Sequence, residues 1–210
     1  PDPINCMISG ATARERGIPS VIDVAGVTCS RMRMQEAHEF IKKYKPSVIK
    51  GNVSEIKAIA GAEFENKGID VGKKDAVSKE DRAGLHAFAQ ILKRYARETG
   101  AIVVATGEVD VITDGIRCCY VYNGSPNMAK ITGTGCMLCC MLGVYLAAVD
   151  PDDKSGQFEA AVLEVVTMGV AGELADAGHG LGSYHVSFLN QLSLLSDGDL
   201  TVHAKYEICF

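Results

Sequence analysis

The sequence lacks several features that would assign a chain to large classes of proteins. Its longest apolar run, residues 136–149, is too short to span a bilayer, and it follows a glycine turn, so it predicts a buried helix and no membrane partner. There is no internal repeat and no low-complexity segment. The net charge is -5 and the basic residues are scattered among acidic ones, which excludes an electrostatic footprint for nucleic acid. These absences leave a small molecule as the expected partner.

Paired CxxC motifs are also absent, although the chain contains eight cysteines. Most of them lie in apolar runs with strand or helix patterns, which indicates reduced thiols and a cytoplasmic location rather than a disulfide scaffold. A metal site formed by some of these thiols is the less favoured alternative. Residues 1–5 contain neither an initiator methionine nor a secretory signal, so we expect this beginning to be a cut end.

The composition of the sequence, with 47% hydrophobic residues and 22 glycines, indicates one α/β domain over residues 1–210. Short β-branched runs alternate with helical patterns, which predicts a three-layer α/β/α fold with a mainly parallel sheet and helices on both faces. The predicted strands cover residues 18–24, 47–50, 101–105, 109–113 and 117–122, of which the last two form a hairpin at the edge of the sheet. The predicted helices cover residues 31–44, 78–98, 136–149, 156–177 and 184–195, together with a short helix that is capped by Asn52 or Ser54 and ends at residue 59. Residues 61–75 are predicted to form a charged loop.

Polar residues follow the predicted strands at their carboxyl ends. Asp23 ends the first strand, Lys50 and Glu55 follow the second, and Thr106 begins a loop after the third. In a parallel sheet these ends meet at one edge, where ligands bind. The polar residues are therefore expected to converge.

The segment Thr132–Cys136 (TGTGC) joins a glycine turn to the long apolar helix. Unpaired N–H groups at a helix N-terminus and close backbone approach at glycine favour an anion, and a phosphate group is the natural ligand. The alternative interpretation is a tight connection in which the glycines serve only the backbone shape.

Three ordered motifs, Lys50–Glu55 (KGNVSE), Ala105–Asp110 (ATGEVD) and Thr132–Cys136 (TGTGC), resemble hydroxyethylthiazole kinase, a member of the ribokinase-like superfamily. The resemblance extends over essentially the whole chain, including residues 188–193. It implies a ribokinase-like fold and ATP-dependent phosphorylation of the primary alcohol of 4-methyl-5-(2-hydroxyethyl)thiazole in thiamine salvage. It also implies a homotrimer with active sites between subunits.

The same resemblance implies roles for the residues that would handle ATP. Asp23 and Glu55 would act on Mg²⁺, partly through water, because that ion keeps much of its hydration shell. Lys50 stands where the family usually has an arginine that contacts the ATP phosphates, so the positive charge is kept but the paired N–H donors of a guanidinium group are lost. Thr106 matches a further ATP-contacting position. The alternative for the two carboxylates is a place in solvated loops.

The acceptor side is implied by the glycine motif. Gly133 would contact the thiazole, and the amides of Gly135 and Cys136 would face the transferred phosphoryl group. Cys136 occupies the place of the aspartate base in ribokinase relatives, either as a thiolate at a helix N-terminus or as a small residue that lets the substrate approach. A loose transition state tolerates a weak base.

Two departures from the family pattern matter. The family's DPVGAGAT-like run is Asp23–Ser30 (DVAGVTCS) in this sequence, without the proline and the second glycine. The family's opening segment, which includes a methionine segment that lines the thiazole pocket, has no counterpart in the sequence. The competing hypotheses are a kinase for another small alcohol, such as hydroxymethylpyrimidine, and a non-catalytic, nucleotide-binding remnant.

Overall fold

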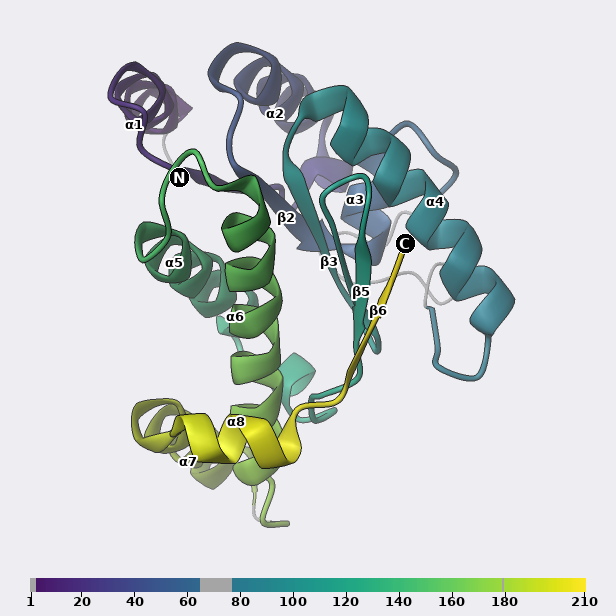
Figure 1. Ribbon diagram of the computed structural model, residues 1–210, viewed down its shortest axis with the longest axis vertical. Helices are drawn as coiled ribbons and strands as arrows, with labels where there is room; N and C mark the ends of the chain where they lie inside the picture. Colours follow the sequence, from purple (N-terminus) through teal and green to yellow (C-terminus); the bar gives the residue numbers. More distant parts are fainter. Residues whose placement is uncertain (1–2, 65–76, 179) are drawn as a thin grey trace.

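The computed structural model describes residues 3–64, 77–178 and 180–210. Most of the predicted charged loop, residues 65–75, lies outside the described residues. The centre of the molecule is a six-stranded sheet whose strand order follows the sequence, from β1 to β6 (Figure 1). None of the described helices is both long and apolar enough to cross a membrane.

The first half of the sheet is parallel, as predicted. It contains β1 (Val21–Asp23), β2 (Val48–Asn52) and β3 (Ile102–Thr106). The register sets Asp23 beside Lys50 and Asn52 beside Thr106, so the carboxyl ends of the three strands form one edge.

The second half of the sheet is antiparallel, with two parallel and three antiparallel pairings in all, so the sheet is mixed and the predicted mainly parallel arrangement holds for its first half. β4 (Asp110–Thr113) and β5 (Cys118–Val121) form the predicted hairpin. Its predicted place at the sheet edge is wrong, because β6 (Tyr206–Cys209) pairs with β5 and forms the edge instead. β6 belongs to a segment for which the sequence predicted no strand.

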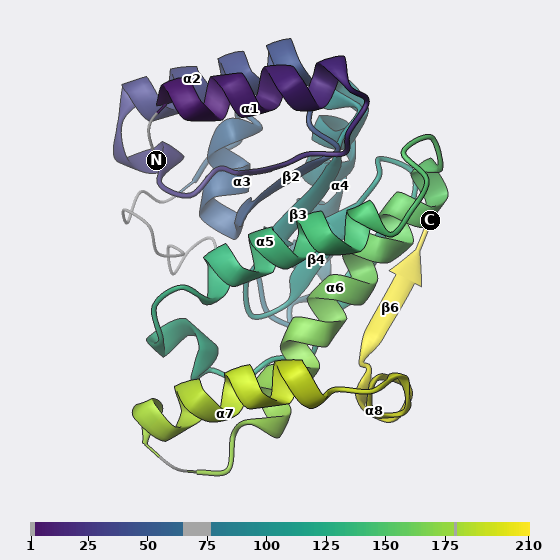
Figure 2. The ribbon, with the colours of Figure 1, turned by 90° about the vertical axis from the view of Figure 1, so that its left-hand side faces the viewer.

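Alternating side chains of the strands enter two cores. On one face Ile49, Val103 and Val111 pack with α2 (Arg31–Tyr44), α3 (Val53–Ile59) and α4 (Arg82–Thr99). On the other, Val48, Val104 and Ile112 pack with α5 (Thr134–Ala147), α6 (Lys154–Leu174) and α7 (Leu181–Leu194). We call this second side the α5–α6 face; Figure 2 shows both helices crossing in front of the sheet. The predicted three-layer α/β/α architecture is therefore confirmed.

Two further α-helices lie in the described residues. α1 (Pro3–Glu15) packs against α2, and α8 (Asp197–His203) leads from α7 into β6. The boundaries of the predicted helices are close to those observed: Asp81 caps α4, Gly100 ends it, and Asp153 caps α6.

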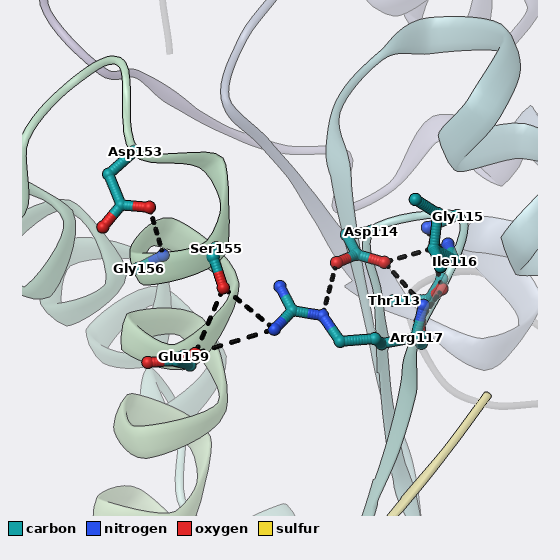
Figure 3. A network of polar contacts seen from close by, with 9 residues as sticks. All are labelled: Thr113, Asp114, Gly115, Ile116, Arg117, Asp153, Ser155, Gly156 and Glu159. Carbon is teal, nitrogen blue, oxygen red and sulfur yellow. Dashed lines mark hydrogen bonds and ion pairs between the residues drawn. The ribbon is translucent and has the colours of Figure 1, made fainter.

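The β4–β5 turn is fixed to the start of α6 by Arg117 (Figure 3). Its guanidinium donates to Asp114 Oδ2 at 2.8 Å and to Ser155 Oγ at 3.1 Å, and it stacks 4.2 Å above the Phe158 ring. Asp114 also accepts the N–H groups of Ile116 and Arg117. This network lies at the end of β4 remote from Asp110, so it serves the fold rather than the edge where the predicted site residues lie.

Candidate active site

Four polar side chains point from the sheet toward the α5–α6 face. Because side chains alternate along a strand, Asp23 follows Val21, Lys50 follows Val48 and Thr106 follows Val104 onto this face. Asp110 shares it with Ile112. The predicted convergence of polar residues from separate strands is therefore present at the carboxyl edge of the parallel strands.

Lys50 and Asp23 form an ion pair at this edge. Lys50 Nζ lies 3.0 Å from Asp23 Oδ2, and the two side chains are 5% and 18% exposed. Asp23 Oδ1 accepts the N–H of Ala25 at 3.0 Å. An ammonium group this well buried needs a counter-charge, and Asp23 supplies it.

The N-terminus of α5 reaches the same ammonium group. Gly133 has a φ of 102°, in the left-handed region that favours glycine, and nothing lies within 4 Å of the place of its Cβ. The first helical hydrogen bond is donated by Met137 to the Gly133 carbonyl, so the helix does not use the N–H groups of residues 134–136. A Cβ added to Gly135 would lie 3.1 Å from Lys50 Nζ. The positive end of the helix and the ammonium group therefore meet at one point.

The side chain of Cys136 is exposed at the open side of this helix start. One turn later, Cys139 is half-buried; burial and the charge of Asp23 raise the pKa of its thiol to about 12, and the charge of Lys50 opposes the rise. Of these two thiols, the one that is partly buried and subject to the charges of the ion pair is Cys139, whereas the predicted catalytic thiol Cys136 is exposed.

Glu55 ties the loop after β1 to the start of α3. Its Oε2 accepts the N–H of Asn52 at 2.8 Å, while Asn52 Oδ1 accepts the N–H of Glu55 at 2.9 Å, which completes a capping box. Its Oε1 accepts the N–H of Gly26 at 2.7 Å. Burial raises the pKa of Glu55, and these two N–H donors and Lys50 oppose the rise. The side chain is 3% exposed, so it is not a solvated loop carboxylate.

The loop after β3 is held by Asp110. Thr106 lies half-buried at the end of β3, with its Oγ1 3.4 Å from the Gly51 carbonyl. Asp110 Oδ1 accepts the N–H of Gly107 at 2.9 Å, which closes the loop. Burial raises the pKa of Asp110 to about 7, although the Gly107 N–H and the Lys50 charge lower it.

Sequence reasoning missed one residue of this region, Glu164 of α6. It is completely buried, and the charges of Asp110 and Lys50 both act on it. The available signal was a carboxylate in the middle of an apolar stretch of α6, between Leu163 and Val165, at a position where an apolar side chain would fit the pattern.

Across the described parts of the chain, no three His, Cys, Asp or Glu side chains gather in a way that could hold a metal ion. Mg²⁺ does not require such a group, because it commonly uses one or two carboxylates together with water and substrate phosphates. Asp23 fits that use, because its carboxylate is partly exposed beside Lys50. Glu55 fits it less well, because its two carboxylate oxygens already accept the N–H groups of Gly26 and Asn52 and have only their other lone pairs for a metal ion. Two shallow surface hollows, one along α7 and one between α5 and α6, include none of the predicted site residues.

The chain is similar to known proteins in both sequence and structure. A model of the hydroxyethylthiazole kinase family matches residues 2–198. Hydroxyethylthiazole kinase 2 of Clostridium botulinum (strain Hall) is 40% identical over 191 residues, which are 91% of this chain and 69% of the relative. Hydroxyethylthiazole kinase of Ruminiclostridium cellulolyticum is 37% identical over 194 residues, 91% of this chain and 67% of the relative.

Among solved structures, hydroxyethylthiazole kinase protein from Pyrococcus horikoshii OT3 superimposes with a TM-score of 0.79 at 27% identity, covering 99% of this chain and 72% of that one. Pyridoxal kinase from Staphylococcus aureus, in complex with AMP-PCP and pyridoxal, gives a TM-score of 0.59 at 14% identity, with 99% and 68% of the two chains covered. This second likeness shows the fold alone.

Proposed function

Because the chain belongs to the hydroxyethylthiazole kinase family, we propose that it transfers a phosphoryl group from ATP to the primary alcohol of 4-methyl-5-(2-hydroxyethyl)thiazole, a step of thiamine salvage. The observation that carries this proposal is the meeting of the Lys50 ammonium group with the N-terminus of α5 at Gly135. Phosphoryl transfer depends on positioning and on neutralising charge, and these two groups supply positive charge at one point.

On the nucleotide side, Lys50 and the amides of Gly135 and Cys136 bind phosphate oxygens, and Thr106 contributes a hydroxyl from the neighbouring strand end. Lys50 now forms an ion pair with Asp23. A phosphate group would compete for the ammonium and a cation would compete for the carboxylate. A nucleotide and its metal ion would therefore replace the ion pair together.

Mg²⁺ would be held by Asp23, and by Glu55 through water, and it would neutralise charge on the transferred phosphoryl group. The main contribution of Glu55 is to fix the backbone at Gly26 and Asn52. This keeps Asp23, at the start of the same loop, in place.

On the acceptor side, the open space at Gly133 admits the thiazole, and Cys136 lies at the same helix start. Cys136 either takes the alcohol proton or only positions the alcohol. The active enzyme is a homotrimer with sites between subunits, in the cytoplasm, where ATP is available.

The test is coupled ADP release with Mg²⁺, ATP and hydroxyethylthiazole, with hydroxymethylpyrimidine as the control alcohol. The proposal predicts ADP release that depends on the thiazole. Release with the pyrimidine alone would assign a different alcohol, and ATP binding without turnover would identify a non-catalytic member of the family.

A further inference from the structure

Glu164 is a buried carboxyl group for which the proposed reaction gives no role. Its side chain is 0% exposed, and in the described part of the molecule neither Oε1 nor Oε2 has a hydrogen-bond partner. Replacing an unsatisfied buried carboxyl by an apolar side chain is often neutral or stabilising. Packing therefore does not account for a glutamate at this position.

The position of Glu164 relates it to the candidate active site. It lies on α6 between Val162 and Val165, which belong to the core under the α5–α6 face, and α6 packs on β3, β4 and β5. Lys50 and Asp110 point from the sheet toward the same face.

α6 meets one end of the β4–β5 hairpin where Arg117 donates to Ser155, and the other end where Gly169 lies against Asn123. Glu164 lies between these two contacts, closer along the helix to Gly169, and so over the half of the hairpin in which Asp110 pairs with Val121.

The charged groups that act on Glu164 come from two strands. Burial and the Asp110 charge raise the pKa of Glu164 well above its usual range, and Lys50 of β2 lowers it. Cys119 of β5 also lies in the core under the α5–α6 face. Burial raises the pKa of its thiol to about 12, so this thiol is neutral as well. α5 and α7 contribute apolar and aromatic side chains, among them Leu142 and Phe188. These surroundings favour the neutral form of Glu164, which carries a proton that it can donate.

We propose that Glu164 is a positioning residue of the nucleotide site and acts through Asp110; this inference rests on the proposed kinase function. Asp110 Oδ1 is engaged by the Gly107 N–H. A neutral Glu164 has an O–H that it can donate to the other oxygen of Asp110 after a side-chain rotation. The bond fixes Asp110, and with it the Thr106–Asp110 loop, before nucleotide enters the site beside Lys50, so the two carboxyls interact with or without ligand.

The experiment compares three variants for ATP affinity and thermal stability. Glu164→Leu keeps the size but removes the donor, so ATP affinity falls about tenfold, the effect of one hydrogen bond to a charged group. Its melting temperature is unchanged or higher. Glu164→Gln retains an N–H donor and keeps ATP affinity within about threefold of the parent protein.

The matched control is Gln157→Leu. Gln157 is buried two helical turns before Glu164, and it bonds to the Pro151 carbonyl and to Lys154. Its replacement lowers the melting temperature and leaves ATP affinity unchanged. A purely structural role for Glu164 would produce this control pattern, whereas the positioning role produces loss of affinity without loss of stability.

A second measurement needs no ligand. Urea unfolding of Asp110→Asn, Glu164→Leu and the double variant at pH 8 forms a double-mutant cycle, and we expect the unfolding constants to depart from additivity by about fivefold or more. If the parent protein binds no ATP, the proposed function fails and this cycle alone decides whether the two carboxyls interact. Additive effects, or parental ATP affinity in Glu164→Leu, overturn the inference.

Discussion

Two glycines of α5 allow a sharp test of the anion site, because only one of them faces it. A Cβ at Gly135 would lie 3.1 Å from Lys50 Nζ, closer than a carbon normally approaches a nitrogen, whereas nothing lies within 4 Å of a Cβ at Gly143. In both cases alanine favours the helix by up to about 1 kcal/mol. The two substitutions therefore have similar effects on stability and different effects on the site.

Gly135→Ala requires the ammonium to move by a few tenths of an ångström and places a methyl group where a phosphate oxygen would bind. Losing one charge-assisted hydrogen bond costs about 1.5–3 kcal/mol, which corresponds to about 10- to 150-fold weaker ATP binding. Gly143→Ala leaves ATP binding unchanged.

The assay is isothermal titration of ATP into each variant, with thermal unfolding in parallel. Parental affinity in Gly135→Ala, or equal losses in both variants, would refute the assignment of Lys50 and the α5 N-terminus as the phosphate site. A large loss of stability in Gly135→Ala would show instead that the methyl group disturbs the fold.

Four other substitutions probe single side chains of the site and of the remote turn. Lys50→Ala removes the counter-charge of Asp23 and raises the KM for ATP about tenfold or more in the coupled assay, and an unchanged KM would contradict its assignment to the phosphates. Cys136→Ala, at an exposed thiol, lowers kcat far more than ATP affinity; equal effects on both would remove its assigned role. The raised pKa of Asp110 means that the folded state holds its proton more tightly than the unfolded state does. The contribution of this group to stability is therefore lost as pH rises from about 4 to about 7. In Asp110→Asn we expect the midpoint of urea unfolding to change less with pH over that range than in the parent protein. Arg117→Ala removes contacts with Asp114 and Phe158 and lowers the free energy of unfolding in urea by about 1–3 kcal/mol. Its KM for ATP is unchanged; a changed KM would show that the remote turn is coupled to the site.

The sequence predicts the part of the fold that carries the site, and the reason is physical. Strands β2 and β3 are covered on both faces, so Val48–Ile49 and Ile102–Val104 appear in the sequence as short β-branched runs. The cap of α3 was predicted at Asn52 or Ser54, and the structure has it at Asn52; such a cap is visible in the sequence because a capping box acts within four residues. These local signals are sufficient to place Asp23, Lys50 and Thr106 at one edge of the sheet.

The remainder depends on contacts between distant segments. β6 is a short edge strand with alternate residues exposed, so its apolar signal is weak and its pairing with β5 was not predicted. α8 carries a capping box between Ser196 and Asp199, a local signal in the sequence from which no helix was predicted. The relation of Glu164 to Asp110 is not local, because a helix and a strand must first pack together. The same holds for the exposure of Cys136 and the partial burial of Cys139.

Phosphorylation of the thiazole alcohol by this chain can be observed directly by phosphorus NMR of a mixture of the protein, Mg²⁺, ATP and hydroxyethylthiazole. We expect the γ-phosphate resonance of ATP to decline while one phosphate monoester resonance grows, and Gly135→Ala to slow both changes when ATP is not saturating. Loss of ATP with only inorganic phosphate formed, or bound ATP that remains intact, would contradict the proposed kinase function.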